Sequence, residues 1–357
     1  MRKLFGVIGL IVFFIGLGMF YLLNSGKVVF SPQKNFVKEP ARLENYQGVI
    51  PGKSMYLYSS MFAKNTEIIT MDHTKLGKKY SISASAGFSK MAQNERGDFW
   101  IYSSRTSDVY KIDSNGQVTK DKWTKDKTRG TNFLFLHKDD KLGIFQTEDP
   151  DINHIYIKNP NGEFNLKLEG FSQLAAADAH KYYIYSGLMK QQKCVVYVID
   201  RTSGKLTETI QLSGNSVQGA EDIQVINGKL FITTKPTLTI VDLTTRTISN
   251  LDEKNLLPKE IYNHVKEATI YISYTDETGK LYIGKYDYSL KKINLESVNS
   301  QARRVAFTDE YIYAQSASEK GKVEIAAYSL KDLHEVGRGT MTPNRYNESA
   351  IDLGILP

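Results

Sequence analysis

One pattern limits the possible folds of this chain more than any other feature: a unit of about 43 residues recurs seven times. Each unit holds an apolar segment that follows a short polar turn, and a second apolar segment that ends at a polar residue. The first segments begin at Met55, Phe99, Leu142, Tyr182, Leu230, Ile270 and Tyr311. The second segments end at Asp72, Asp113, Asn159, Asp200, Asp242, Asp287 and Ser329.

The repeat predicts a β-propeller. The segments alternate with period two and are rich in Tyr, Ile, Val and Thr, which is typical of strands and not of helical repeats. Four strands in a unit of this length form one propeller blade. The fourth unit shows all four, as SQLAAAD, KYYIYSG, KCVVYVID and KLTETIQL. We therefore expect an all-β, seven-bladed β-propeller over residues 46–357.

Two segments resemble a known family. The stretch VVYVIDRTSGKLTETIQLSG (195–214) resembles the third and fourth strands of the YVTN-type, WD-repeat-like bacterial propeller repeat, and TLTIVDLTTRTISNL (237–251) is a looser copy. The last two units, with GKYDYSLKKINLE and AAYSLKDLHEV, depart from that repeat. Propellers of this family are scaffolds with many unrelated functions, so the resemblance implies a propeller and export from the cytoplasm but no particular activity.

The N-terminal segment predicts a membrane anchor. Leu4 to Leu23 is an uncharged, mostly apolar run of 20 residues, which as a helix spans about 30 Å, the thickness of a hydrocarbon core. The run is longer than the apolar part of a cleavable signal, and no small-x-small cleavage site follows it. We expect a retained transmembrane signal-anchor helix over 4–23 and a polar juxtamembrane tether over 24–45.

The charges near this segment leave its orientation open. Arg2 and Lys3 precede the apolar run, as in an export signal, which would place the propeller outside the cytoplasm. Four basic residues follow the run before residue 45, and a Lys/Arg count alone would favour the opposite orientation. Because large domains translocate largely regardless of their own charge, we expect a single-pass cell-membrane protein with an extracytoplasmic propeller.

The net charge of +7 does not indicate a nucleic-acid-binding protein. Residues 1–45 carry six basic and two acidic side chains, and the rest of the chain carries 40 basic and 37 acidic ones. Cations beside a membrane helix meet anionic headgroups, whereas the propeller surface is almost balanced. We expect a membrane, a protein or an anionic envelope polymer as partner, and no nucleic acid.

The sequence offers no recognisable catalytic, metal or cofactor motif. Cys194 is the only cysteine and is interpreted as a buried strand residue, which excludes an internal disulfide and a Cys-based zinc site. The six histidines show no HxH or HExxH spacing, and GxSxG, Walker A and GxGxxG are absent. The aspartates that end the second segments recur before tight turns, so we interpret them as Asx-turn residues. We therefore predict no catalytic residues, no metal and no cofactor.

The candidate ligand-binding residues lie where each inner strand begins, because these points gather on one face of a propeller around the axis. We call this face the funnel. Counting back from the first apolar segment of each unit gives a set that differs from blade to blade. The set is Lys90, Gln173, Glu221, Asp222, Asn263, Arg303 and Arg304.

Arg303 and Arg304 are the strongest members of this set, because arginine forks suit carboxylate or phosphate groups. Side chains alternate along a strand, so we expect one arginine in the funnel and the other directed at an acidic residue of a neighbouring blade. In the alternative, the pair binds Glu221 and Asp222 and lines a solvated channel.

These features predict a membrane-anchored, non-catalytic binding or scaffold module for a protein or an anionic envelope component. The alternative is a propeller hydrolase or lyase that acts on a small extracellular metabolite, such as a lactone or a sugar. An enzyme of that kind needs convergent metal ligands or an acid–base pair in the funnel, and the scattered histidines argue against the first of these.

Overall fold

A computed structural model describes residues 40–59, 65–83, 88–94, 96–113, 116–123, 128–213, 219–317 and 321–356. The anchor expected over 4–23 lies outside the described residues, as does most of the expected tether. Within the described ranges, no helix has the length and apolar character needed to cross a membrane.

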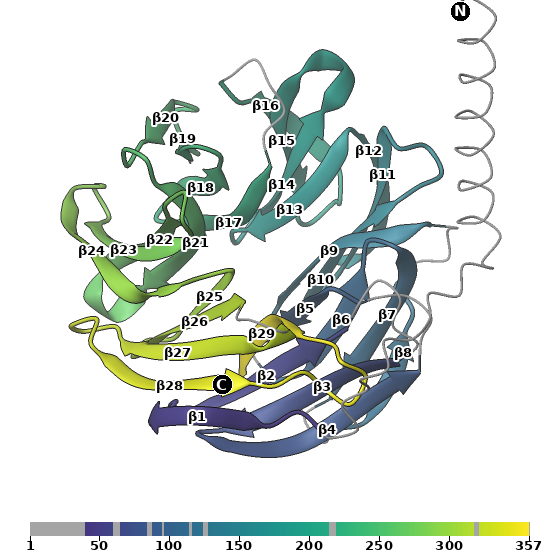
Figure 1. Cartoon of the computed structure of the whole chain (residues 1–357). Coiled ribbons are helices and arrows are strands. Elements are labelled where there is room, and N and C mark those ends of the chain that lie inside the picture. The colour runs from purple at the N-terminus through teal and green to yellow at the C-terminus, as the bar shows by residue number, and fades with distance from the viewer. Residues whose placement is uncertain are drawn as a thin grey trace, which may run out of the picture. The chain divides into compact units, whose positions relative to one another are not determined.

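The described strands form seven antiparallel sheets around a central axis, which confirms the seven-bladed β-propeller (Figure 1). The fourth blade has the predicted strands in the predicted order. They are β13 (Phe171–Ala177), β14 (Lys181–Leu188), β15 (Lys193–Asp200) and β16 (Leu206–Gln211), from the axis outward.

The other blades repeat this meander. The second and third blades contain β5 (Lys90–Gln93), β6 (Phe99–Ser103), β7 (Thr106–Ile112), β8 (Val118–Asp121), β9 (Gly130–His137), β10 (Asp140–Gln146), β11 (Ile152–Asn159) and β12 (Gly162–Glu169). The fifth and sixth contain β17 (Ala220–Ile226), β18 (Lys229–Thr234), β19 (Leu238–Asp242), β20 (Ile248–Leu251), β21 (Leu257–His264), β22 (Thr269–Thr275), β23 (Lys280–Asp287) and β24 (Lys292–Gln301). Short 3₁₀ turns, η1 (Met189–Gln191) and η2 (Val265–Glu267), lie between strands of the fourth and sixth blades.

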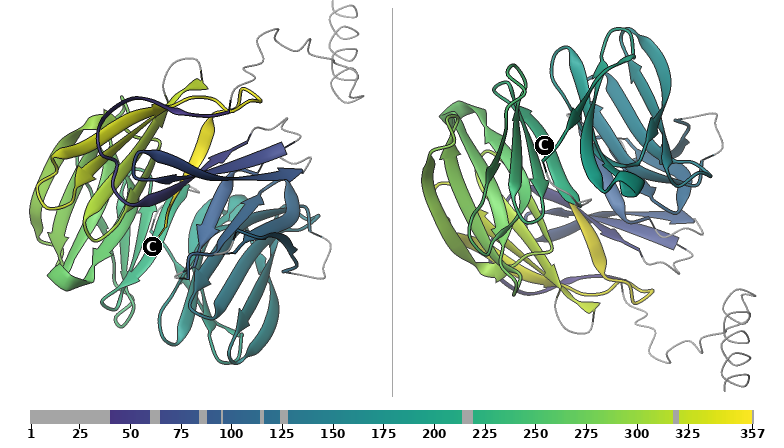
Figure 2. Two further views of the ribbon diagram at one scale, coloured as in Figure 1. Left: turned by 90° about the horizontal axis from the view of Figure 1, so that it is seen from below. Right: turned by 90° about the horizontal axis from the view of Figure 1, so that it is seen from above.

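The two ends of the described chain close the ring. The seventh blade contains β25 (Arg304–Phe307), β26 (Tyr311–Ala317), β27 (Val323–Ser329) and β28 (Glu335–Met341), and β1 (Leu43–Gly48) pairs with the outer edge of β28. The last strand, β29 (Ala350–Leu356), is the inner strand of the first blade, next to β2 (Lys53–Tyr58), β3 (Asn65–Asp72) and β4 (Lys75–Ser83). Figure 2 shows this yellow strand among the purple ones. β1 begins before residue 46, where the propeller was expected to start.

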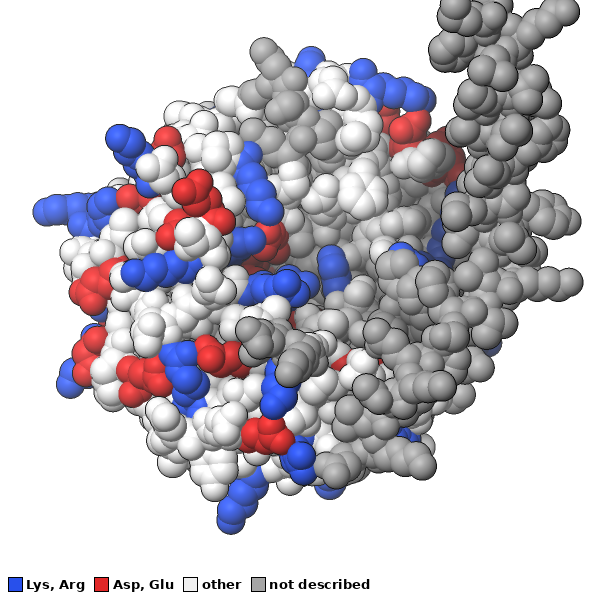
Figure 3. Space-filling model, viewed as in Figure 1, with Lys and Arg blue, Asp and Glu red and all other residues white. Residues whose placement is uncertain are grey.

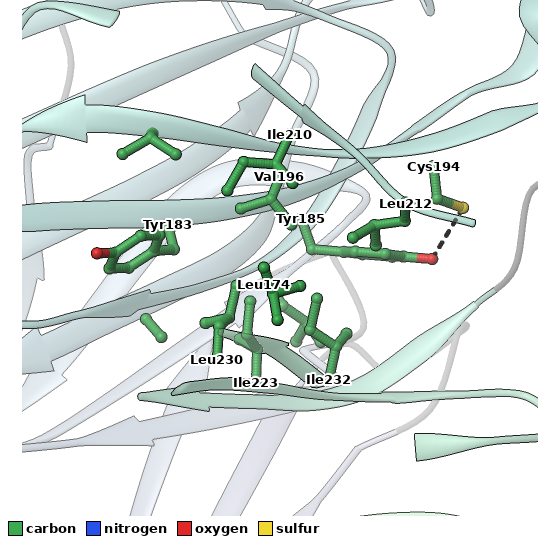
Figure 4. Packing of buried hydrophobic residues seen from close by; sticks show 13 residues of the cluster. Leu174, Tyr183, Tyr185, Cys194, Val196, Ile210, Leu212, Ile223, Leu230 and Ile232 are labelled. Atoms are coloured by element: carbon green, nitrogen blue, oxygen red, sulfur yellow. Dashed lines mark hydrogen bonds between the residues drawn. The ribbon is translucent and has the colours of Figure 1, made fainter. Parts of the chain in front are cut away.

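Burial explains why these segments form strands. Every residue of β6 and β22 is buried, while the outer strand β12 mostly alternates between partly buried and exposed positions. Continuous apolar character suits a strand covered on both faces, and alternation suits one that faces water. Adjacent blades share their core, as Figure 4 shows for Leu174 and Tyr185 of the fourth blade against Ile223 and Ile232 of the fifth. Cys194 is buried in this cluster, as the sequence indicated.

Candidate functional site

The inner strands have β-bulges at their funnel ends, and these bulges position the residues of the candidate site. The pairing of β17 with β18 slips between Ala220 and Ile223, and that of β21 with β22 slips between Pro258 and Ile261. β9, β13 and β29 show a register shift at the corresponding place. A β-bulge inserts residues that leave the regular alternation of side chains. The bulges therefore free consecutive polar residues to face the axis.

A cavity of about 740 Å³ lies at this end of the axis. Five of the seven predicted residues line it: Lys90, Gln173, Glu221, Arg303 and Arg304. Lys259, Ser104 and Asn132 line it as well. In Figure 3, basic side chains gather around the hollow in the middle of this face. The structure thus brings together residues from the second, third, fourth, fifth, sixth and seventh blades.

Asp222 and Asn263 do not line this cavity. The Asp222 carboxylate accepts hydrogen bonds from the backbone N–H groups of Ile223 and Ile261, both at 2.8 Å, and burial raises its pKa. Asn263 lies near the opposite end of β21, where its Oδ1 accepts a hydrogen bond from the Tyr288 hydroxyl. The turn η2 lengthens the connection between β21 and β22, so the count along the sequence reaches the wrong end of this strand.

The two arginines differ in their partners. Arg304 Nε lies 3.3 Å from Oδ1 of Asp352 in β29, which belongs to the neighbouring blade. Arg303 forms no side-chain hydrogen bond or ion pair with the described residues, and it is exposed. The expected acidic partner in a neighbouring blade is therefore present for one arginine. Both arginines nevertheless line the cavity, because Arg303 precedes β25 and is not bound by the alternation within that strand.

The alternative pairing of these arginines with Glu221 and Asp222 is not what the structure shows. Oε1 of Glu221 binds Nζ of Lys259 at 2.7 Å and Nζ of Lys235 at 2.9 Å. Glu221 is thus neutralised by two lysines from the fifth and sixth blades. Arg303 keeps its charge uncompensated by any described acidic side chain.

The sequence analysis missed several charged residues of the funnel, among them Lys259, Glu260 and Asp352, and also Asp276 and Glu277, which line the cavity. The Glu260 carboxylate makes no hydrogen bond or ion pair with a described residue, and burial, with nearby Asp222, raises its pKa well above the ordinary value. Burial also raises the pKa of Asp352 against the opposing effect of Arg304. Burial and the Arg304 charge lower the pKa of Lys90. No sequence motif marks these residues, because only closure of the ring brings them together.

Four of the five hairpin aspartates have the predicted structural role, whereas the Asp72 carboxylate contacts Nδ1 of His73 instead. Oδ1 of Asp200 accepts hydrogen bonds from the backbone N–H and the hydroxyl of Ser203, both at 2.7 Å, and Asp242 accepts two backbone N–H bonds in the same way. These bonds lower the pKa of both carboxyl groups. In the part of the chain that the structure describes, no three His, Cys, Asp or Glu side chains are grouped to hold a metal ion.

Comparison with known proteins shows the fold alone. No protein-family model and no curated protein sequence matches the chain. A putative 6-phosphogluconolactonase from Bacteroides uniformis is 8% identical, with a TM-score of 0.56 over 86% of this chain and 100% of that one. A catalytically inactive virginiamycin B lyase from Staphylococcus aureus with quinupristin is 11% identical, with a TM-score of 0.52 over 85% and 99%. A dihydro-heme d1 dehydrogenase is 13% identical, with a TM-score of 0.52 over 84% and 66%. These propellers have different roles.

Proposed function

We propose that this propeller is a non-catalytic binding module that captures an anionic group of its ligand in the funnel. The observation that carries the proposal is Arg303, a guanidinium without a described acidic partner that opens onto the cavity. A carboxylate or phosphate can accept two parallel hydrogen bonds from such a fork. Lys90 lines the same cavity and has no described acidic side chain bound to it, so it adds a second positive charge.

Two acidic residues of the funnel are paired with cations. Glu221 is bound by two lysines, and Asp352 is paired with Arg304. Glu260 has a raised pKa and so resists taking a negative charge. Asp276 and Glu277 also line the cavity, so binding depends on direct contact with the Arg303 fork and not on the net charge of the cavity.

A titration of the full chain in detergent micelles with small carboxylates and phosphates tests the proposal. Arg303→Ala should weaken binding about tenfold or more, because a hydrogen bond to a charged group is lost. Lys331→Ala, which changes an exposed lysine in the hairpin between β27 and β28, is the control and should bind as the wild type does. Equal affinities of the wild type and Arg303→Ala would contradict the proposal.

The proposal includes a membrane tether outside the cytoplasm. It is supported by the apolar run from Leu4 to Leu23 and the basic residues before it. A module held at the membrane surface would meet envelope polymers or other surface proteins. N-terminal sequencing of the protein from the membrane fraction should find residue 1 or 2. A mature start between residues 24 and 30 would show that the segment is cleaved.

A second candidate function, hydrolysis or lysis of a small metabolite such as a lactone or sugar, is favoured by one observation. Glu260 and Asp222 are neighbouring carboxyl groups close to the funnel cavity, and burial raises the pKa of each. A general acid needs a carboxyl group whose pKa is raised in this direction. Turnover of lactones or glycosides that is lost in Glu260→Gln would support this function. Binding of such compounds without turnover would favour the binding module.

A further inference from the structure

Two more cavities adjoin the funnel on the same face. One of about 420 Å³ shares Arg303 and Ile351 with the funnel cavity. A third cavity, of about 400 Å³, shares Ser316 and Ala317 with the cavity of about 420 Å³. Their linings come from the connections at the funnel ends of strands in the sixth, seventh and first blades. We call these three adjoining cavities together the seventh-blade groove.

The groove also joins the funnel at a second point. Gly279 lines the funnel cavity, and its chain neighbours Thr278 and Lys280 line the third cavity. The hairpin between β22 and β23 thus forms part of the wall of both. Asp276 and Glu277 of the same hairpin also line the funnel cavity.

Cations with available charge stand at both ends of the groove. Arg303 lies at the inner end, where the first two cavities meet. Lys280 lies in the third cavity, over the ring of Tyr282 at 5.6 Å, and forms no ion pair with a described residue. Lys322 and Arg338 also line the groove, but they bind Glu44 and Glu324, respectively.

Between these cations the lining is mixed. Its polar part consists of hydroxyl and amide side chains, and its apolar part includes Val298, Val323 and Ile351. The polar residues are Gln315, Ser316, Ser349, Asn299, Ser300 and Gln301. Hydroxyls and amides both donate and accept hydrogen bonds. Such a wall suits the hydroxyl groups of a ligand, and the spaced cations suit anionic groups that recur along it.

We propose, on the basis of the binding function above, that the seventh-blade groove binds a linear polyanion built from hydroxyl-bearing units. A cavity of about 300–1,000 Å³ holds one small molecule. The funnel cavity of about 740 Å³ is therefore large enough to hold one unit of the ligand without the other two cavities. Two further cavities, each of which shares lining residues with its neighbour, suit additional units of the same kind.

The lining distinguishes this ligand from single-stranded nucleic acid. Sites for unpaired bases use aromatic side chains as stacking platforms. Phe171 is the only aromatic residue among the described residues that line the three cavities. The groove therefore offers charge and hydrogen bonds to a polymer but no series of rings for bases.

Titration of the full chain in detergent micelles with oligomers of increasing length tests this inference. Galacturonate monomer, trimer and hexamer represent a carboxylate polymer, and glycerol phosphate oligomers of equal charge represent a phosphodiester polymer. The series that gains affinity with length identifies the anionic group. We expect the hexamer to bind about three- to fivefold more tightly than the monomer, because it reaches a second cation.

Matched variants separate the ends of the groove. Lys280→Ala should weaken the hexamer about three- to fivefold and leave the monomer unchanged. Arg303→Ala should weaken both. Lys291→Ala changes an exposed lysine at the opposite end of β23 and should affect neither.

Three outcomes would contradict the inference or its basis. Equal affinity for monomer and hexamer, with dependence on Arg303 retained, overturns the extended groove and leaves the funnel site standing. No binding of any anion overturns the proposed function itself. Equal binding of a single-stranded oligonucleotide of the same charge overturns the assignment to a hydroxylated polymer.

Discussion

Asp140 illustrates how one buried carboxylate joins two blades. Its Oδ2 lies 2.6 Å from a guanidinium nitrogen of Arg201 and accepts a hydrogen bond from the Tyr182 hydroxyl at 2.8 Å. The Asp140 side chain is 1% exposed and that of Arg201 is 20% exposed. Asn159 completes the group, since its amide donates to the Tyr182 hydroxyl and to the Arg201 carbonyl. The fourth blade is thereby fastened to the third.

Removal of this carboxylate should be costly. Asp140→Ala leaves the partly buried Arg201 charge without its partner, and we expect unfolding free energy to fall by about 3–5 kcal/mol. Urea unfolding measures the change. The control is the neighbouring residue: Asp139→Ala breaks an exposed pair with Arg96, which should cost about 0–1 kcal/mol. Similar small losses in both variants would show that the buried pair does not hold the blades together.

Glu260 should make stability depend on pH. Its pKa is raised well above the model-peptide value of 4.5 by burial and by Asp222, with Glu221 and Asp352 adding and Arg304 opposing. The folded protein therefore holds this proton more tightly than the unfolded chain does. Its contribution to stability is complete below pH 4.5 and is lost as pH rises through the raised pKa.

The variant Glu260→Gln tests this dependence, because it keeps the shape of the protonated acid and cannot ionise. Its melting temperature should exceed that of the wild type at pH 8 and equal it at pH 4. Anion affinity at pH 8 should also be higher in the variant, since a charged Glu260 repels the ligand. A wild type and a variant with parallel pH profiles would exclude Glu260 as the titrating group.

At the scale of elements, the strands that fill the middle of each blade could be predicted and the closing strands could not. β6 and β22 are buried along their whole length, so their apolar runs mark them as strands. β29, with the sequence AIDLGIL, does not pair with the strand that precedes it in the chain. Its partner β2 lies about 300 residues earlier in the chain. Such a pairing leaves no local pattern.

Removal of β29 should open the ring. A chain without residues 349–357 leaves the inner edge of β2 unpaired and exposes core residues of the first blade, such as Tyr56 and Leu57. We expect the sharp thermal transition of the full chain to broaden or disappear. Addition of a peptide with the sequence of residues 349–357 should restore it. A truncated protein that melts as the full chain does would show that β29 does not close the propeller.

For the whole molecule, the site is a product of closure. Five of the predicted residues meet in one cavity because they begin inner strands of different blades, which the period of the repeat allowed us to expect. The pairing of Arg304 with Asp352 and of Lys259 with Glu221 joins residues of different blades. Bulges decide which of two adjacent residues faces the axis, and they follow from pairing across the sheet. The sequence alone shows neither the ion pairs between blades nor the positions of the bulges.

The location of the bound anion is the central claim, and lysine acetylation measured by mass spectrometry tests it without mutation. The full chain is labelled with and without a saturating amount of the anionic oligomer that binds most tightly. Binding in the funnel should protect Lys90, and binding along the seventh-blade groove should protect Lys280, while Lys291 and Lys331 react at unchanged rates. Unchanged labelling of Lys90, with protection of Lys291 or Lys331 instead, would place the ligand elsewhere and contradict the account.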